Sequence, residues 1–185
     1  MMSFPRVSFH VGVLLTLLFG VGRTSGTTMI PMSVEVMAEK ADAVVHGVVA
    51  RRSVSRHGDR LTTRVTLKVE EVLKGRVEGG EITIIQAGGT LGERRTRVVG
   101  APNFTVGSEV VVFLVFNKRG EGVVLGLAQG KFDVFADAAG RKQARNRFHG
   151  GRAAAKGSER ALFNKLGGRP LTLDQLRGRV RARGK

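Results

Sequence analysis

The feature of this sequence that most constrains its fold is a series of short apolar runs separated by glycine-rich turns. The runs are rich in valine, and residues 64–70 alternate apolar with polar side chains, as strands with one wet face do. The strands predicted from these runs lie at residues 43–49, 63–73, 81–86, 109–116, 123–127 and 131–135, with at most one more short strand around 96–99. Six or seven short strands with frequent turns predict a mainly β fold, a small closed barrel or a sandwich.

Two longer polar stretches interrupt the predicted strands. Residues 51–60 contain His57-Gly58-Asp59 and are interpreted as the turn of a hairpin between the first two strands. Residues 88–108 contain several glycines and Pro102, so we expect a long irregular loop there.

Short helices are predicted on both sides of the strands. Ser33 is a suitable N-cap for a helix over residues 33–40. Thr172 and Gln175 have the spacing of a capping box, and Leu173, Leu176 and Val180 follow at helical spacing. A C-terminal amphipathic helix over 173–182 is therefore expected, and residues 158–166 are a candidate for another.

The N-terminal segment has the features of a signal peptide. Arg6 and His10 precede an apolar run at 11–22, and small residues follow up to Gly26. Twelve residues are too few to span a bilayer as a helix. We predict cleavage after Gly26 and an exported protein, periplasmic or extracellular, with no transmembrane segment in its mature chain; a buried N-terminal helix is the alternative.

The positive charge is concentrated near the C-terminus. Residues 141–185 contain 14 lysines and arginines against Glu159 and Asp174, whereas residues 1–140 contain 17 basic and 13 acidic residues. The predicted organisation is a signal peptide at 1–26, a β-barrel domain at 27–137, and a basic linker with a helical tail at 138–185. Such a tail binds polyanions at low salt.

The residues give little support for catalysis. The chain has no cysteine, which excludes thiol chemistry, disulfides and sulfur-ligated zinc. Its histidines beyond the signal peptide, His46, His57 and His149, have no metal-ligand spacing, so a metal site would have to be assembled by the tertiary structure. We expect no cofactor, no metal and no enzymatic activity; an enzyme site formed by Asp42, His46 and His57 is the remaining alternative.

Several motifs are similar to those of a known module. Residues 41–49 (ADAVVHGVV), residues 69–75 (VEEVLKG) and residues 104–114 (FTVGSEVVVFL) resemble the framework of the netrin-like module, the OB-type barrel also found in tissue inhibitors of metalloproteinases. The similarity extends over residues 38–127. The elements ADxVVxG, LKG, GAPxFxxGE and AQGKF are also similar to those of a family of uncharacterised exported bacterial proteins, although here Ser108 stands between the glycine and Glu109 of the third element.

The resemblance implies an OB-like, netrin-like β-barrel, closed or partly open, and a binding module. The inhibitors act through a cysteine-pinned N-terminus, which this chain lacks, so no functional residue is transferred. We predict a non-enzymatic module that engages another envelope or secreted protein through the 88–108 loop and the 128–132 segment, with Gln129, Lys131 and Phe104 as contact residues. The alternative for 128–132 is a bulge with an exposed lysine.

A second prediction concerns anionic polymers. The basic C-terminal tail is the alternative binding element, for polyanions or nucleic acid. Its candidate residues are Arg177, Arg179, Arg181 and Arg183.

Overall fold

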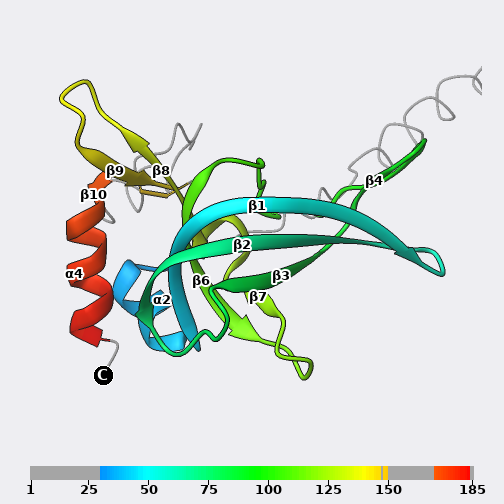
Figure 1. The fold of residues 1–185 in the computed structure, drawn as a ribbon, viewed down its shortest axis with the longest axis horizontal. Helices are drawn as coiled ribbons and strands as arrows, with labels where there is room; N and C mark the ends of the chain where they lie inside the picture. Colours follow the sequence, from blue (N-terminus) through cyan, green and yellow to red (C-terminus); the bar gives the residue numbers. More distant parts are fainter. Residues whose placement is uncertain (1–29, 147, 150–168, 184–185) are drawn as a thin grey trace, which may run out of the picture. The chain divides into compact units, whose positions relative to one another are not determined.

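The computed structural model describes residues 30–146, 148–149 and 169–183. Contacts divide the chain into two units, residues 1–30 and 31–185, and the elements below belong to the second. This unit is mainly β, with short helices near both of its ends (Figure 1). Its elements are α2 (Val34–Lys40), β1 (Ala43–His57), β2 (Arg60–Lys74), β3 (Glu81–Ala87), β4 (Gly89–Leu91), β5 (Arg94–Thr96), β6 (Glu109–Phe116), β7 (Gly122–Val124), the 3-10 turn η2 (Leu127–Gly130), β8 (Lys131–Ala136), β9 (Lys142–Arg145), β10 (Leu171–Thr172) and α4 (Leu173–Arg183).

The main sheet has eight strands in the order β1-β2-β3-β7-β6-β8-β9-β10, and β1 also pairs with β6. Strands β1, β2, β3, β7 and β6 therefore each pair with two others of this set. The pairing of β3 with β7 is parallel and consists of Ile84 opposite Gly122, and the other pairings are antiparallel. Strands β4 and β5 form a separate two-stranded sheet.

Strand β6 divides the apolar interior into two clusters. Val110, Val112 and Leu114 belong to a cluster with side chains of β1, β2 and β3. Val111 and Phe113 face the opposite way and pack with residues of α2, β8 and α4. A strand buried on both faces needs apolar residues at consecutive positions, which explains the uninterrupted sequence VVVFL at 110–114.

Both described helices begin at the caps predicted from the sequence. The Ser33 hydroxyl accepts a hydrogen bond from the Val36 N–H at 3.2 Å. At the start of α4, the Thr172 hydroxyl accepts from the Gln175 N–H at 3.1 Å, and the Gln175 side chain accepts from the Thr172 N–H at 3.0 Å. The predictions of a mainly β fold and of a short C-terminal helix are confirmed.

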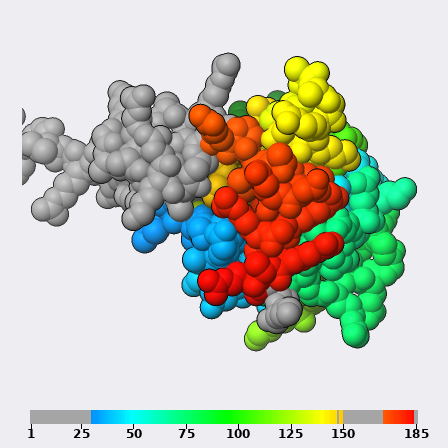
Figure 2. All heavy atoms as spheres, turned by 90° about the vertical axis from the view of Figure 1, so that its left-hand side faces the viewer, coloured from blue at the N-terminus to red at the C-terminus, as the bar shows by residue number. Residues whose placement is uncertain are grey.

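Helix α4 packs against the rest of the domain. Its apolar residues Leu173, Leu176 and Val180 are buried in the cluster that contains Val34 and Met37 of α2. Figure 2 shows α4 (red) lying over α2 (blue), with the β8–β9 hairpin (yellow) at one end of the helix. The apolar stripe read from the sequence is therefore the face that α4 buries.

The β1–β2 hairpin is longer than the sequence predicted. The stretch at 51–60, interpreted as a turn, continues both strands, and only Gly58 and Asp59 form the connection. Gly58 has a φ of +58°, which a residue with a side chain adopts at a cost. The prediction failed because most of these residues are exposed, so the strands carry no apolar pattern that periodicity could detect.

Three further elements differ from the predictions. Strand β9 lies inside the segment expected to be a linker and pairs with β8, so residues 131–135 are not the last strand. The 88–108 loop contains the hairpin of β4 and β5 instead of one strand at 96–99. Strand β7 ends at Val124, earlier than expected, and η2 follows it.

Some predictions concern residues beyond this description. The helix proposed at 158–166 and the signal peptide at 1–26 lie outside the described residues. Neither of the helices described here is both long and apolar enough to cross a membrane.

Candidate functional site

The distal part of the β1–β2 hairpin extends beyond the main core. Strand β1 pairs with β6 only as far as Val48, and from Arg51 to His57 it pairs with β2 alone among the described residues. Figure 1 shows this hairpin reaching away from α4, on the side of the unit where β4 lies. The β4–β5 hairpin contacts it, with Gly89 against the side chains of Val54 and Thr63. We call residues 51–64 and 89–97 together the arginine arm.

The arginine arm is strongly basic and exposed. It contains eight arginines against two acidic residues, Asp59 and Glu93, and all ten are exposed. The arginines are Arg51, Arg52, Arg56, Arg60, Arg64, Arg94, Arg95 and Arg97. Within the described part of the chain, Arg52, Arg60, Arg95 and Arg97 form no ion pair, so their guanidinium groups face solvent.

The arginines of α4 have a different environment. Glu71 of β2 accepts hydrogen bonds from Arg177 Nε at 2.8 Å and from Arg181 Nη2 at 2.7 Å. Arg177 also donates to Asp174 at 2.8 Å, and Arg179 lies 3.6 Å from a carboxylate oxygen of Glu35. The hydrogen bonds to Asp174 and Glu71 raise the pKa of Arg177.

These contacts qualify the prediction of a polyanion-binding tail. Three of its four candidate arginines, Arg177, Arg179 and Arg181, already face carboxylates of α2, β2 or α4 itself. The fourth, Arg183, is exposed at the end of the helix and forms no ion pair with any residue that the structure describes. Binding by this tail stays a prediction.

The residues predicted as partner contacts are buried. The exposed fractions of Gln129, Lys131 and Phe104 are 3%, 8% and 2%. The Gln129 side chain accepts a hydrogen bond from the Met32 N–H at 2.9 Å. Lys131 donates to Asp133 at 2.5 Å, and its ammonium group lies 5.4 Å from the centre of the Phe104 ring. The expectation of an exposed lysine is wrong; a role in binding a partner stays a prediction.

The structure does not bring Asp42, His46 and His57 together. The Asp42 carboxylate accepts a hydrogen bond from the Phe116 N–H at 2.8 Å and fixes the start of β1 against β6. His57 is exposed at the tip of the arginine arm. His46 is 3% exposed and lies near Glu70 and Glu109 instead.

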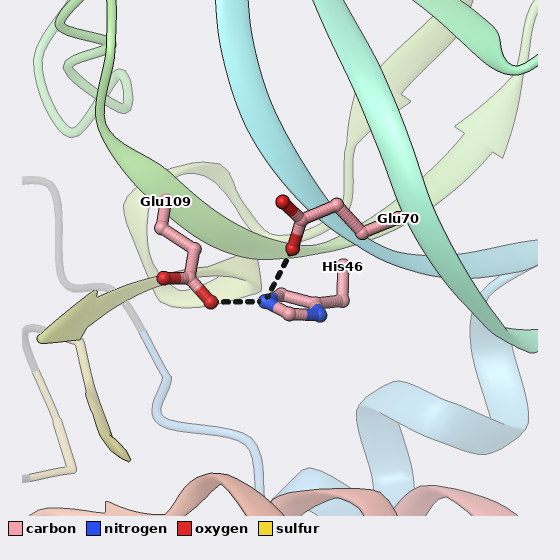
Figure 3. A group of neighbouring side chains, drawn as sticks. All are labelled: His46, Glu70 and Glu109. Carbon is pink, nitrogen blue, oxygen red and sulfur yellow. Dashed lines mark hydrogen bonds and ion pairs between the residues drawn. The ribbon is translucent and has the colours of Figure 1, made fainter. Parts of the chain in front are cut away.

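His46 is the centre of a charged group, the His46 cluster, which comprises His46, Glu70, Glu71, Glu109 and Lys142. His46 Nε2 lies 2.6 Å from a carboxylate oxygen of Glu109 and 3.7 Å from one of Glu70 (Figure 3). The same oxygen of Glu109 accepts a hydrogen bond from Lys142 at 2.7 Å. Burial opposes the ionisation of Glu109, but the hydrogen bonds from Lys142 and His46 outweigh it and lower the pKa of Glu109.

Sequence reasoning missed both the arm and this cluster. The density of arginine at 51–60 was visible, but the stretch was interpreted as a turn. The carboxylates at 70–71 and at 109 stand 24 or more positions from His46, and only the pairing of β1 with both β2 and β6 brings them to it.

The chain was compared with known proteins. No protein-family model matches the sequence, and no curated protein matches it. The function of the chain is therefore inferred from the residues and geometry described above.

Proposed function

We propose that this chain is an exported, non-enzymatic binding module that engages an acidic protein through its arginine arm. One observation carries the proposal: a strand pair leaves the core and exposes eight arginines against two acidic residues. Ordering such a segment costs conformational entropy. Because most of its residues are exposed, burial within the chain offsets little of that cost. An acidic surface would give these exposed charges partners, and complementary charge accelerates association and orients the complex.

The fold that we propose for the module is an OB-like barrel of the netrin-like type. The pairings of β1 with β6 and of β3 with β7 support it, since they link the five strands into a ring. OB barrels use the loop between their first two strands, among other surfaces, to bind ligands. The tip of the β1–β2 hairpin is the corresponding position here.

Two properties of the arm favour a protein over a nucleic acid. The arm contains no Phe, Tyr or Trp, and proteins that bind single strands use such side chains to stack bases. The outer edge of β1 from Arg51 to His57 is also without a strand partner among the described residues, so an extended acidic segment can add to it as a strand. Arginine suits this role because its planar guanidinium binds a carboxylate with two parallel hydrogen bonds.

Replacing the four unpaired arm arginines tests the proposal. The arm variant carries Arg52→Gln, Arg60→Gln, Arg95→Gln and Arg97→Gln. The matched control removes four exposed positive charges elsewhere, with Lys40→Gln, Lys68→Gln, Arg76→Gln and Lys118→Gln. Each protein is immobilised, exposed to native envelope and secreted fractions, and washed at low and at high salt. The recovered protein is then purified, and its affinity for each variant is measured directly.

We expect one acidic protein that the wild-type chain and the control variant bind equally, and that the arm variant binds at least tenfold more weakly. Equal binding by the arm variant would overturn the proposal. Binding of added heparin or single-stranded DNA alone, with affinity falling steeply as salt rises, would assign the arm to polyanions instead.

A further inference from the structure

We propose that His46, Glu70 and Glu109 form a binding site for a divalent transition-metal ion of the zinc type. The inference is independent of the arginine arm, because these residues belong to the opposite end of β1 and β2 and to the start of β6. The donor atoms of the three side chains all lie within 4.8 Å of one another (Figure 3).

An irregularity in the pairing of β1 with β2 assembles the site. His46 lies opposite Glu71, but the next residue, Gly47, lies opposite Val69, so Glu70 has no partner of its own. Such a bulge breaks the alternation of side chains, which lets Glu70 and Glu71 both approach His46.

Gly47 makes this bulge possible. A Cβ atom at position 47 would lie 2.1 Å from the backbone oxygen of Lys68, a distance that no side chain tolerates. The third carboxylate comes from β6, where Glu109 pairs with Val48 and is thus the diagonal neighbour of His46 on the same face.

The three side chains offer the ligands that zinc and similar ions bind. Imidazole nitrogen and carboxylate oxygen are both common zinc ligands, and zinc sites with three protein ligands bind water at the fourth position. The separations of His46 Nε2 from the oxygens of Glu109 and Glu70, 2.6 and 3.7 Å, fall on either side of the spacing between ligands of one tetrahedral ion, about 3.3 Å for metal bonds of about 2.0 Å. Small rotations of the two carboxylates would make these two nitrogen–oxygen separations equal.

Burial divides the site into a fixed ligand and two accessible ones. His46 is almost completely buried, whereas the side chains of Glu109 and Glu70 are 23% and 46% exposed. An ion can therefore enter from the solvent side, between the carboxylates, while the imidazole stays in place.

The other nitrogen of His46 provides a second observation. His46 Nδ1 is buried and forms no hydrogen bond with any described residue, and a carboxylate oxygen of Glu71 lies 4.0 Å away from it. With Nε2 bound to a metal ion, the ring proton resides on Nδ1 and faces Glu71. A metal-bound histidine usually donates its distal ring N–H to such a group. Glu71 also accepts the hydrogen bonds of Arg177 and Arg181, so the imidazole and this carboxylate have to move closer together for Nδ1 to donate to it.

Lys142 competes with the ion. Its ammonium group donates to the same oxygen of Glu109 that His46 contacts, and it places a positive charge beside the site. Lys142 is 53% exposed at the start of β9, so the side chain is free to move into solvent when an ion binds. Removing this charge should strengthen metal binding, which distinguishes a metal site from a network that only joins strands.

The test is a calorimetric titration of the purified full chain with ZnCl2, followed by Co²⁺ absorption as a spectroscopic report on the ligands. We expect one saturable site. Glu70→Gln, Glu109→Gln and His46→Gln should each weaken binding at least tenfold, and Lys142→Gln should strengthen it severalfold. Glu78→Gln, at an exposed carboxylate outside the cluster, is the matched control and should leave binding unchanged.

A loss of zinc binding must be distinguished from a loss of folding. Glu70 is half exposed, so Glu70→Gln folds even if His46→Gln does not, and circular dichroism of every variant checks this. The proposal is overturned if zinc shows no saturable binding, if Glu70→Gln and Glu109→Gln bind zinc as the wild type does, or if His57→Gln abolishes binding while His46→Gln retains it.

Discussion

The arginine arm and helix α4 are both rich in arginine, yet a larger share of the α4 arginines faces carboxylates: three of four in α4 against four of eight in the arm. In α4, Arg177 and Arg181 converge on Glu71 of β2, and Arg179 faces Glu35 of α2. In the arm, four of the eight arginines have no acidic partner among the described residues. Charge density along a sequence therefore does not tell whether the charge is available; the acids that the fold brings alongside decide it.

The two regions are expected to have different functions. The apolar face of α4 is buried and its charges are largely neutralised, which is expected of an element that stabilises the domain. The arm buries little and exposes its charge, which is expected of an element that contacts something else. Mutations whose effects on stability and on binding are measured separately test this distinction.

The largest expected effect on stability comes from shortening a buried side chain of α4. Leu176 is fully buried in the cluster formed with α2 and β6. Leu176→Ala should lower the free energy of unfolding by about 2–5 kcal/mol, through lost burial and the cavity it leaves. Urea denaturation followed by circular dichroism measures the change.

The control for Leu176→Ala is the same substitution in the arm. Leu91 is 44% exposed, and Leu91→Ala should change the free energy of unfolding by less than about 0.5 kcal/mol. Similar losses at the two positions would show that the arm is as much a part of the core as α4 is.

Gln129→Ala should have the second-largest effect. The side chain is buried, and its oxygen accepts the hydrogen bond of the Met32 N–H. Removing the oxygen leaves a polar group without its partner, which costs about 1–3 kcal/mol. An unchanged thermal midpoint, together with weaker binding of a partner, would support Gln129 as a contact residue.

The sequence predicted those elements whose residues face an apolar interior. Strand β6 and helix α4 were located within a residue or two, because consecutive apolar residues at 109–116 and a capping box at 172–175 have direct structural causes. The length of the β1–β2 hairpin was not predicted, since an exposed strand has no apolar alternation. Strand β9, KQAR, is equally polar apart from Ala144, which is buried.

The candidate sites were predictable only in part. Most of the 88–108 region is exposed, as expected of a contact loop, but its predicted contact residue Phe104 is buried. Gln129 and Lys131 are buried as well, although amides and cations usually lie at the surface. Each has a specific partner, Met32 and Asp133 respectively, that no local pattern reveals. The His46 cluster depends on a bulge in β2 and on the register between β1 and β6, neither of which periodicity specifies.

Glu71→Gln should lower stability less than Gln129→Ala does. It should also free the positive charges of Arg177 and Arg181 to bind other groups. It weakens the hydrogen bonds from Arg177 and Arg181, which are 29% and 62% exposed, so the loss should be about 1 kcal/mol or less. The released arginines should make α4 a better polyanion binder. We expect later elution from a heparin column; unchanged elution would indicate that pairing with Glu71 does not limit the availability of these arginines.

A pH-dependent effect on the α4 region should follow from His149. Burial, then the charge of Arg179, lower the pKa of His149 from 6.5, against an opposing contribution from Glu35. Its stabilising contribution is complete above pH 6.5 and is lost as the pH falls below that value, because the unfolded chain binds a proton that the folded chain resists. Urea denaturation at pH 7.5 and 5.5 should show a larger loss for the wild type than for His149→Gln. Equal losses would contradict a neutral, buried imidazole.

The smallest change in stability per substituted position is expected in the arginine arm, where the change in binding should be greatest. Replacing Arg52, Arg60, Arg95 and Arg97 by glutamine removes four charges that repel one another and that no described acid neutralises. The free energy of unfolding should shift by less than about 0.5 kcal/mol per position, with a net direction toward higher stability as repulsion is relieved. A clear loss of stability in urea denaturation would mean that these guanidinium groups support the fold. A gain would mean that the folded chain maintains an unfavourable concentration of positive charge, as expected of a surface that binds an acidic partner.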